Sequence, residues 1–400
     1  MRVLVLSAFL PSRESGGRVR LRALMRGLAE RHRVSLVSFA PPDADPETVA
    51  EVRASYEEVV VIPSTHVATR ARKRRLQLRS FASARSFERF TCEQPELQAA
   101  VDAVLARRSF DVVHVEGCAM AHYDLHGAAP VVLDEQNVEY DVLRRVVKVT
   151  PSLARRFYNE VDARKLRREE ERSWRTADAV GMTSERDASF VRAAAPRTPV
   201  AVVPNGVDAT AFAPSPSVPE WGTLLFFGEL GYYPNTDAML FFANEVLPLL
   251  RRSHPSARLV IVGPSAPLAI RALASAGVVV TGAVPDVRPF IARAHAVIVP
   301  LRVGGGTRLK ILEAMAMGRP VVSTSLGAEG LAVANGRDIL IADGAPAFAD
   351  AVARVLDDER ISLSLALAGR RLVEREYDWP ASVRRLEALY ATTLASAAAA

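Results

Sequence analysis

The sequence predicts an α/β protein built from two doubly wound domains. Short apolar runs rich in valine and isoleucine alternate with helical patterns along the 400 residues. Strands that read as continuous apolar runs are typical of parallel sheets covered by helices on both faces. A stretch rich in proline and small residues interrupts this alternation at residues 206–222, after which it starts again. The length also favours two or three domains, at about 150 residues each.

The expected strands divide into two sets. Those of the first domain are Val3–Leu6, Val34–Phe39, Val59–Ile62, Val112–Val115, Val131–Leu133, Ala179–Met182 and Val200–Val203, with helices between them such as Arg18–Arg31 and Gln94–Arg108. Those of the second are Thr223–Phe227, Leu259–Val262, Val278–Thr281, Ala296–Val299, Val321–Thr324 and Ile339–Ile341. We therefore place an N-terminal domain at 1–205, a linker at 206–222 and a C-terminal domain at 223–378. A C-terminal helix and tail at 379–400 is expected to be able to fold back onto the N-terminal domain.

The positive charge is concentrated in two segments, Arg70–Arg79 and Arg155–Arg175, in a chain of net charge +6. In the second segment Phe157, Leu166 and Trp174 stand among alternating charges, which predicts a solvated helix with ion pairs four residues apart. The competing interpretation is contact with an anionic membrane surface or a lipid-phosphate acceptor. A nucleic-acid partner is not favoured, because no aromatic-interleaved basic motif accompanies the charge.

The two cysteines and the apolar runs indicate the compartment. Cys92 and Cys118 provide neither a disulfide framework nor metal-ligand spacing, which favours thiols in a reducing environment. The first apolar run is too short for a signal peptide, and no window reaches the ~18 apolar residues of a membrane span. We expect a soluble cytoplasmic protein, placed peripherally at the inner membrane face if the basic helices contact lipid.

The most informative stretch is Ala296–Thr324, AVIVPLRVGGGTRLKILEAMAMGRPVVST. It predicts a strand, a loop at Gly304–Gly306, an N-cap at Thr307 and a helical period from Arg308. Glycine lets backbone N–H groups approach an anion, and a helix start adds partial positive charge. Arg308 and Lys310 stand where the helix dipole prefers acids, which suggests that a diphosphate completes the site. The alternative is a tight turn with two solvated cations.

The matching loop of the first domain is Phe9–Gly17 (FLPSRESGG), between the first strand and a helix. Gly16 and Gly17 there could again allow close approach to an anion, although two glycines are a weak signal. Because ligand loops follow the carboxyl ends of parallel strands, we expect the two sets of loops to face a cleft between the domains.

Several further motifs follow one another in a characteristic order. They are SGGRVR (Ser15–Arg20), DVVHVEG (Asp111–Gly117), LDEQNVEY (Leu133–Tyr140), TADAVGMTSERD (Thr176–Asp187), VVPNGVD (Val202–Asp208), FFGELGYYPN (Phe226–Asn235) and VTGAVPDVRPF (Val280–Phe290). With these motifs and the glycine loop, the chain resembles a retaining glycosyltransferase of family 4, of the bacterial surface-polysaccharide type. The resemblance covers Met1 to roughly Asp378. It implies the GT-B fold, in which two Rossmann-like domains face each other across a cleft.

The resemblance also implies a reaction. A sugar would pass from a UDP- or GDP-linked donor in the second domain to a glycan or lipid-linked acceptor in the first, with retention of anomeric configuration. No metal or other cofactor would be required. Glu313 matches the glutamate of the LEAM motif, which accepts hydrogen bonds from the donor ribose. Its alternative role is an ion pair with Lys310, worth a few tenths of a kcal/mol. The remaining expected donor contacts are Gly17, Gly228 and Val284, the last in a loop that contacts the base through its backbone.

The donor side departs from the family pattern at two places. Many members carry a second, sugar-binding glutamate eight residues before the LEAM glutamate, where this chain has Gly305. Many also place basic residues after the first strand of the second domain, where Gly228–Pro234 carries no cation. Our hypothesis is that Arg308 and Lys310 neutralise the diphosphate instead, which makes them catalytic in the transfer.

The acceptor side departs as well. Family members commonly read DVVHxH, and the second histidine is replaced here by Glu116. We expect His114 to be a core histidine, and Glu116 to orient the donor sugar or act as base toward the acceptor hydroxyl. Its alternative is a loop-capping carboxylate. The other residues expected on the acceptor side are Arg18, Glu135, Asn137 and Glu139, beside Asp134, with turn roles as the alternative.

Other functions compete with this prediction. A sugar-nucleotide epimerase could use the same frame, and a non-catalytic nucleotide-sugar-binding subunit would explain the missing glutamate and histidine. A glycosidase would need a pair of carboxylates at the glycine loop, and the sequence has no such pair there. A nicotinamide dehydrogenase would need a glycine fingerprint after the first strand, which the sequence also lacks. Asp43-Ala44-Asp45 has the spacing of a metal motif but lies in a proline-flanked loop, and the clustered cations make Mg²⁺ redundant.

Overall fold

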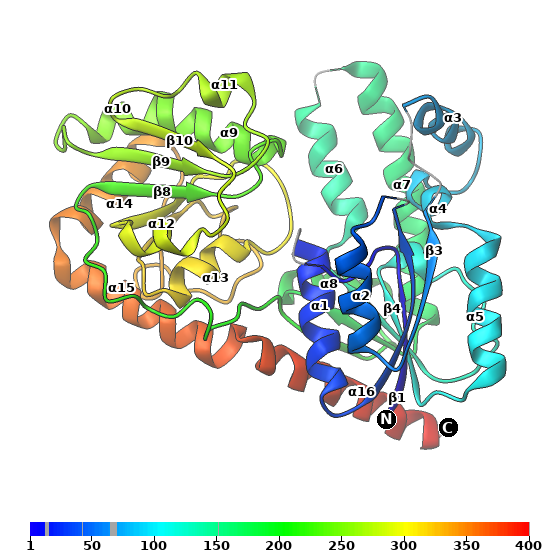
Figure 1. The fold of residues 1–400 in the computed structure, drawn as a ribbon. Helices are drawn as coiled ribbons and strands as arrows, with labels where there is room; N and C mark the ends of the chain where they lie inside the picture. Colours follow the sequence, from blue (N-terminus) through cyan, green and yellow to red (C-terminus); the bar gives the residue numbers. More distant parts are fainter. Residues whose placement is uncertain (13–15, 42, 65–69, 151, 400) are drawn as a thin grey trace. The chain divides into compact units, whose positions relative to one another are not determined.

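The structure, a computed structural model, describes residues 1–12, 16–41, 43–64, 70–150 and 152–399. The chain divides into two compact units, one comprising Met1–Pro204 with Ser382–Ala400 and the other Asn205–Ala381. In each unit a central sheet is covered by helices on both faces (Figure 1). This architecture confirms the predicted GT-B-like pair of doubly wound α/β domains.

The sheet of the first unit is parallel throughout. Its strands are β1 (Arg2–Ser7), β2 (Arg33–Ala40), β3 (Glu58–Pro63), β4 (Val112–Glu116), β5 (Val131–Glu135), β6 (Ala179–Met182) and β7 (Val200–Val202). Their order among the described residues is β3-β2-β1-β4-β5-β6-β7. Because β1 lies between β2 and β4, the chain order reverses there, and ligand loops of open parallel sheets gather at such a point.

The sheet of the second unit repeats the pattern. Its strands are β8 (Thr223–Phe227), β9 (Arg258–Val262), β10 (Val278–Gly282), β11 (Ala296–Val299), β12 (Val321–Ser323) and β13 (Leu340–Ile341). Within the described chain their order is β10-β9-β8-β11-β12-β13, again parallel. The order reverses at β8, between β9 and β11. β8 and β11 are buried along their whole length, as their apolar sequences predict.

The helices connect and cover these strands. In the first unit they are α1 (Gly16–Ala29), α2 (Pro46–Ser55), α3 (Arg70–Phe81), α4 (Phe87–Cys92), α5 (Pro95–Arg107), the 3₁₀ turn η1 (Cys118–Met120), α6 (Glu139–Val149), α7 (Leu153–Thr176) and α8 (Glu185–Ala194). In the second they are α9 (Tyr233–Phe241), the π-helical turn η2 (Phe242–Val246), α10 (Leu247–Leu250), α11 (Leu268–Arg271), α12 (Arg288–Arg293), α13 (Leu309–Ala316), α14 (Ala345–Asp357), α15 (Glu359–Leu372) and the π-helical turn η3 (Val373–Tyr377). α16 (Trp379–Ala399) follows, and its residues from Ser382 onward belong to the first unit.

Each unit has its own hydrophobic core. The first is centred on the sheet and includes the fully buried Trp174 and Phe39. The second includes Phe226, together with Phe242 and Phe348, whose rings meet edge to face at 5.9 Å. Two separate cores are what two independently wound sheets require.

Local contacts explain several helix ends. Asp45, the second acid of the Asp43–Asp45 motif, caps α2 by accepting hydrogen bonds from the N–H groups of Glu47 and Thr48. Its carboxylate is therefore used as an N-cap. The later part of α7 carries the expected ion pairs four residues apart, such as Arg167–Glu171 at 2.6 Å. Across the helices that the structure describes, none combines the length and apolar character that crossing a membrane demands.

Candidate functional site

The glycine loop of the second unit connects the end of β11 to α13. The helix begins at Leu309, with Arg308 as its N-cap residue. The expectation that Thr307 caps the helix is wrong, as is a helical start at Arg308. The buried Thr307 hydroxyl has no hydrogen-bond partner in the described structure. Gly304 and Gly306 take positive φ angles of 111° and 80°. Arg308 has an extended backbone (φ −90°, ψ 90°), so the helix starts one residue later than predicted.

The side chain of Lys310 leaves its own loop and reaches the end of β8. Its ammonium Nζ donates a hydrogen bond to Asn235 Oδ1 at 3.0 Å and lies 3.8 Å from the centroid of the Phe226 ring. A Cβ on Gly228 would be only 3.0 Å from this Nζ. The Gly228–Pro234 loop, which has no cation in its sequence, therefore has one brought to it by α13.

Two residues that sequence reasoning did not assign hold this loop in place. Asn235, near the start of α9, accepts from Lys310 and donates through Nδ2 to the Glu229 carbonyl at 2.7 Å. Gly263, after β9, leaves room for the Gly228 carbonyl, which a Cβ there would approach to 1.8 Å. Asn235 ends the FFGELGYYPN motif, so its position was visible, but its contact with Lys310 was not.

Lys310 and Glu313 are half-buried residues whose pKa values are shifted toward neutral pH. Burial lowers the pKa of Lys310 to about 7, helped by the charge of Arg308 and opposed by Glu313. Burial raises the pKa of Glu313 to about 7, against the influence of Lys310. In the described structure, the Lys310 ammonium donates a hydrogen bond to Asn235 and forms no ion pair with Glu313.

Two further residues expected to bind the donor are Arg308 and Val284. The Arg308 guanidinium donates from Nη1 to the carbonyls of Gly305 and Gly306, so it lies over the glycine loop. Val284 is half-buried against the core of the second unit, in the loop after β10. The structure therefore gathers Gly228, Gly304–Gly306, Lys310 and Arg308 around the ends of β8 and β11.

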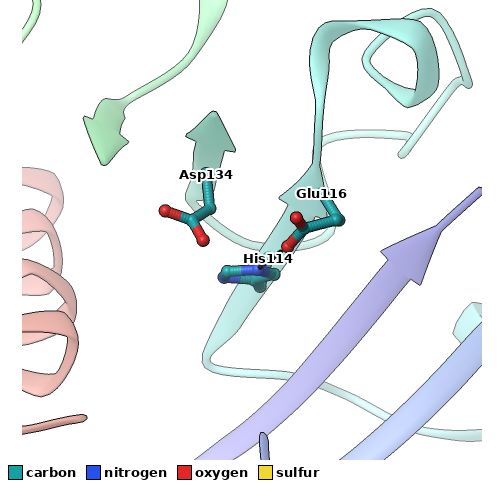
Figure 2. A group of neighbouring side chains, drawn as sticks. All are labelled: His114, Glu116 and Asp134. Atoms are coloured by element: carbon teal, nitrogen blue, oxygen red, sulfur yellow. Dashed lines mark hydrogen bonds and ion pairs between the residues drawn. The ribbon is translucent and has the colours of Figure 1, made fainter. Parts of the chain in front are cut away.

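The first unit has a second polar cluster at the ends of β4 and β5. His114, Glu116 and Asp134 point toward one another (Figure 2). His114 Nε2 lies 3.4 Å from Glu116 Oε2, and His114 Nδ1 lies 2.8 Å from the hydroxyl of Tyr390 on α16. Gln136 donates to the other Glu116 oxygen at 2.5 Å. His114 is fully buried, as a core histidine should be.

The third member of the cluster, Asp134, is held by Arg20 of α1. The guanidinium donates from Nε at 3.0 Å and from Nη2 at 2.8 Å to the two carboxylate oxygens, and both side chains are fully buried. His114, Glu116 and Asp134 offer ligand atoms within 4.8 Å of one another. Each is already engaged by Tyr390, Gln136 or Arg20, and a guanidinium repels a cation. The geometry favours a hydrogen-bonded network over a metal site.

The residues expected on the acceptor side differ in how deeply they are buried. Glu135 is buried, with Trp174 Nε1 donating to it at 3.4 Å, and burial with the neighbouring Glu170 raises its pKa well above the usual range. Glu139, at the start of α6, accepts from Asn137 at 3.1 Å, and burial also raises its pKa. Glu135 therefore lies deeper in the unit than its loop position suggested.

The loop after β1 is described only in part. Residues 13–15, including the serine of the SGGRVR motif, lie outside the described residues. Gly17 lies against the side chain of Gln136, whose Oε1 would be 2.6 Å from a Cβ at this position. Arg18 lies over the ring of Phe9, 6.0 Å from its centroid. The glycine thus lets α1 approach the Gln136–Glu116 contact.

Two family models match the chain. "Glycosyl transferase 4-like domain" matches residues 15–206 and "Glycosyl transferases group 1" matches residues 222–358. Between them they leave only residues 1–14, 207–221 and 359–400 unmatched. The first model falls on the first unit and the second on the second, so the family matches follow the same division as the fold.

The chain is also similar to individual curated proteins and solved structures. Glycogen synthase of Mycobacterium tuberculosis is 30% identical over 198 residues, which cover 45% of this chain and 45% of that protein. The chain thus spans about half the length of the curated relatives it matches. Sucrose-phosphate synthase of Thermosynechococcus elongatus superimposes with a TM-score of 0.72 at 18% identity, over 99% of this chain and all of that one. Anabaena HepE in complex with UDP-glucose gives 0.66 at 16%, with the same coverage.

The two units have the GT-B fold of these structures. Each unit matches one glycosyltransferase family model, and the two models together match most of the chain.

Proposed function

We propose that this protein transfers a sugar from a nucleotide diphosphate sugar to a glycan or lipid-linked acceptor, with retention of anomeric configuration, as a family 4 enzyme of the surface-polysaccharide type. The observation that supports it most is the half-buried Lys310 ammonium, which lies at the end of β8 beside a loop that has no cation of its own. Anabaena HepE, which shares the fold, forms a complex with UDP-glucose, and UDP-linked sugars are therefore the first donors to test. We place the reaction in the cytoplasm.

The donor is proposed to bind mainly to the second unit. Gly304–Gly306 and Gly228 allow the diphosphate to approach backbone N–H groups, and Thr307 lines the same loop. Arg308 and Lys310 neutralise its charge. Glu313 accepts hydrogen bonds from the ribose hydroxyls, and the backbone near Val284 contacts the base. Gly17, in the first unit, stays a prediction from the resemblance.

The acceptor is proposed to bind to the first unit, near Arg18, Asn137 and Glu139. Glu116 lies at the carboxyl end of β4, where it orients the donor sugar or accepts the proton of the acceptor hydroxyl. A carboxylate can only accept hydrogen bonds, so His114 would donate from Nε2 to Glu116 and accept at Nδ1 from Tyr390. Glu135, being buried, would support this loop rather than touch the acceptor.

Breaking the anomeric bond places negative charge on the leaving diphosphate and positive charge on the sugar ring. The glycine-loop N–H groups, Arg308 and protonated Lys310 stabilise the diphosphate as it leaves. The acceptor hydroxyl attacks the anomeric carbon on the same face of the sugar ring from which the diphosphate leaves. The anomeric configuration is therefore retained. With two cations at the diphosphate, we propose that the reaction needs no metal.

A panel of UDP-, GDP- and ADP-linked sugars tests the donor class by thermal shift. One of them should raise Tm in a concentration-dependent way, because a ligand that binds only the folded state stabilises it. Lys310→Met should remove most of that shift, while Arg302→Ala, a nearby arginine paired with Asp237 at 2.8 Å, should leave it unchanged. No stabilisation by any sugar nucleotide would contradict the proposal. Donor conversion that needs no acceptor would indicate an epimerase, and binding without turnover a non-catalytic subunit.

Donor binding is expected to change the protonation of Lys310 and Glu313 in opposite directions. In the free protein both pKa values lie at about 7. A diphosphate favours the ammonium, so binding at pH 8 should take up a proton at Lys310. Ribose hydroxyls favour the carboxylate, so binding at pH 6 should release a proton from Glu313. The esterified diphosphate of a sugar nucleotide does not titrate in this range and adds no proton of its own.

Calorimetry in two buffers of different ionisation enthalpy measures both proton changes. At donor concentrations high enough to saturate the weakened variant, Lys310→Met should abolish the uptake at pH 8 and keep the release at pH 6. Glu313→Gln should do the reverse. The same proton exchange in both variants as in the parent protein would refute the assignment of these two groups to the donor.

A further inference from the structure

We infer that the first unit has a docking surface for an anionic lipid bilayer, formed by α3, the end of α6 and the start of α7. We name this the tip surface: Arg70–Phe81, Val146–Lys148 and Leu153–Phe157. α6 and α7 run side by side, and α3 lies next to α7 (Figure 1). The inference goes beyond sugar transfer, since membrane binding needs neither donor nor acceptor.

Exposed apolar side chains are confined to the tip surface in the first unit. Within the described residues of that unit, every large hydrophobic side chain that is exposed belongs to it: Leu78, Phe81, Val146, Leu153 and Phe157. Leu153 is 76% exposed, Leu78 72% and Phe157 62%. The rings of Phe81 and Phe157 lie 6.3 Å apart and join α3 to α7. Apolar residues gathered in this way on one surface mark an interaction site.

The charge of the tip surface has a single sign. The sequence of α3, RARKRRLQLRSF, contains no acid, and neither does Leu153–Phe157, which contains Arg155 and Arg156. By contrast, the later part of α7 neutralises its arginines with Glu160 and Glu171. α3 and Leu153–Phe157 therefore combine cations that have no acid in their own segments with exposed apolar side chains.

This combination fits a bilayer better than a protein or a nucleic acid. Leucine and phenylalanine at helix ends can enter the acyl boundary while arginines remain at the level of the phosphates. Anionic headgroups supply the opposite charge over a broad area, as α3 requires. A hollow of about 600 Å³ lies beside α3. Its lining includes Arg75 and Arg79, and its acid, Glu93, is paired with Arg85, so a phosphate headgroup has room to approach the arginines.

Flotation of the full chain with lipid vesicles tests this inference. Vesicles of phosphatidylcholine with phosphatidylglycerol should bind the protein at least ten-fold better than phosphatidylcholine alone, and high salt should weaken the binding. Leu153→Ser/Phe157→Ser should lower the partition at least ten-fold with the charge unchanged. Arg74→Glu/Arg75→Glu should lower it by a similar factor with the apolar side chains unchanged.

Matched controls lie on α15 of the second unit. Leu363→Ser/Leu367→Ser removes side chains that are 57% and 51% exposed, and Arg360→Glu/Arg371→Glu reverses two exposed arginines. Both controls should bind vesicles like the parent protein. Equal loss in test and control variants, or equal binding to neutral and anionic vesicles, would overturn the inference. So would a parent dimer in solution that Leu153→Ser/Phe157→Ser dissociates, because the tip surface would then serve a second copy. Unchanged Tm and unchanged sugar-nucleotide binding show that each variant is folded.

Discussion

Replacing Arg308 with alanine is expected to lower kcat about 100-fold or more, because an ordered cation beside the leaving diphosphate lowers the barrier by several kcal/mol. Lys310→Met should have an effect of the same order. Methionine keeps an apolar chain of similar length over Phe226 but removes the ammonium that α13 brings to the end of β8. Steady-state kinetics with the donor identified by thermal shift measure both variants. The loss should appear in kcat as well as in kcat/KM, since the charge being stabilised develops in the transition state.

Arg302→Ala provides the matched control for both variants. Arg302 precedes the same glycine loop, but it is partly exposed and pairs with Asp237 of α9. Its removal should change kcat less than about two-fold, since exposed ion pairs contribute little. Near-normal kcat and KM in Arg308→Ala would show that the guanidinium does not act on the diphosphate, and the charge would then have to be met by Lys310 and the backbone alone.

Replacing Arg20 with methionine is expected to lower the free energy of unfolding by about 3–5 kcal/mol. Arg20 and Asp134 form a two-pronged ion pair in which both side chains are fully buried. Removing the guanidinium leaves the Asp134 carboxylate buried without its cation, and a lone buried charge costs more than the ion pair contributes. Urea unfolding followed by circular dichroism measures the difference between variant and parent.

Two further variants separate a lost ion pair from a disturbed helix. Arg22→Met lies on the same helix α1 and breaks a partly exposed pair with Glu51, so it should cost only about 1 kcal/mol. Arg20→Met/Asp134→Leu should recover much of the loss, because the second substitution removes the stranded charge. A single Arg20→Met variant as stable as Arg22→Met would show that Asp134 finds another partner.

The strands were predictable because parallel sheets leave a plain signal. A strand buried on both faces must be apolar at nearly every position, as β8 and β11 are, and such runs are recognised without knowledge of their neighbours. The family motifs located the glycine loop and Glu313 for a similar reason, since each motif is continuous in sequence.

Contacts between distant segments were not predictable in the same way. Nothing in the local sequence of Lys310 shows that its ammonium reaches Asn235, 75 residues away. α13 starts one residue later than predicted because the backbone of Arg308 is extended, which the residue type does not reveal. Glu135 follows an apolar strand like a loop residue, yet it is buried because Trp174 and Glu170 of α7 lie over it.

The membership of residues 382–399 in the first unit has a consequence for biosynthesis. Glu387 of α16 bonds to Arg31 and His32, and Tyr390 bonds to His114, so the first unit is completed by chain that leaves the ribosome after all of the second. Domains usually fold as units in order of synthesis. Here the surface of the first unit that α16 covers stays uncovered until the whole second unit has been synthesised. A nascent chain halted before residue 382 should therefore have a stable second unit and an incomplete first one.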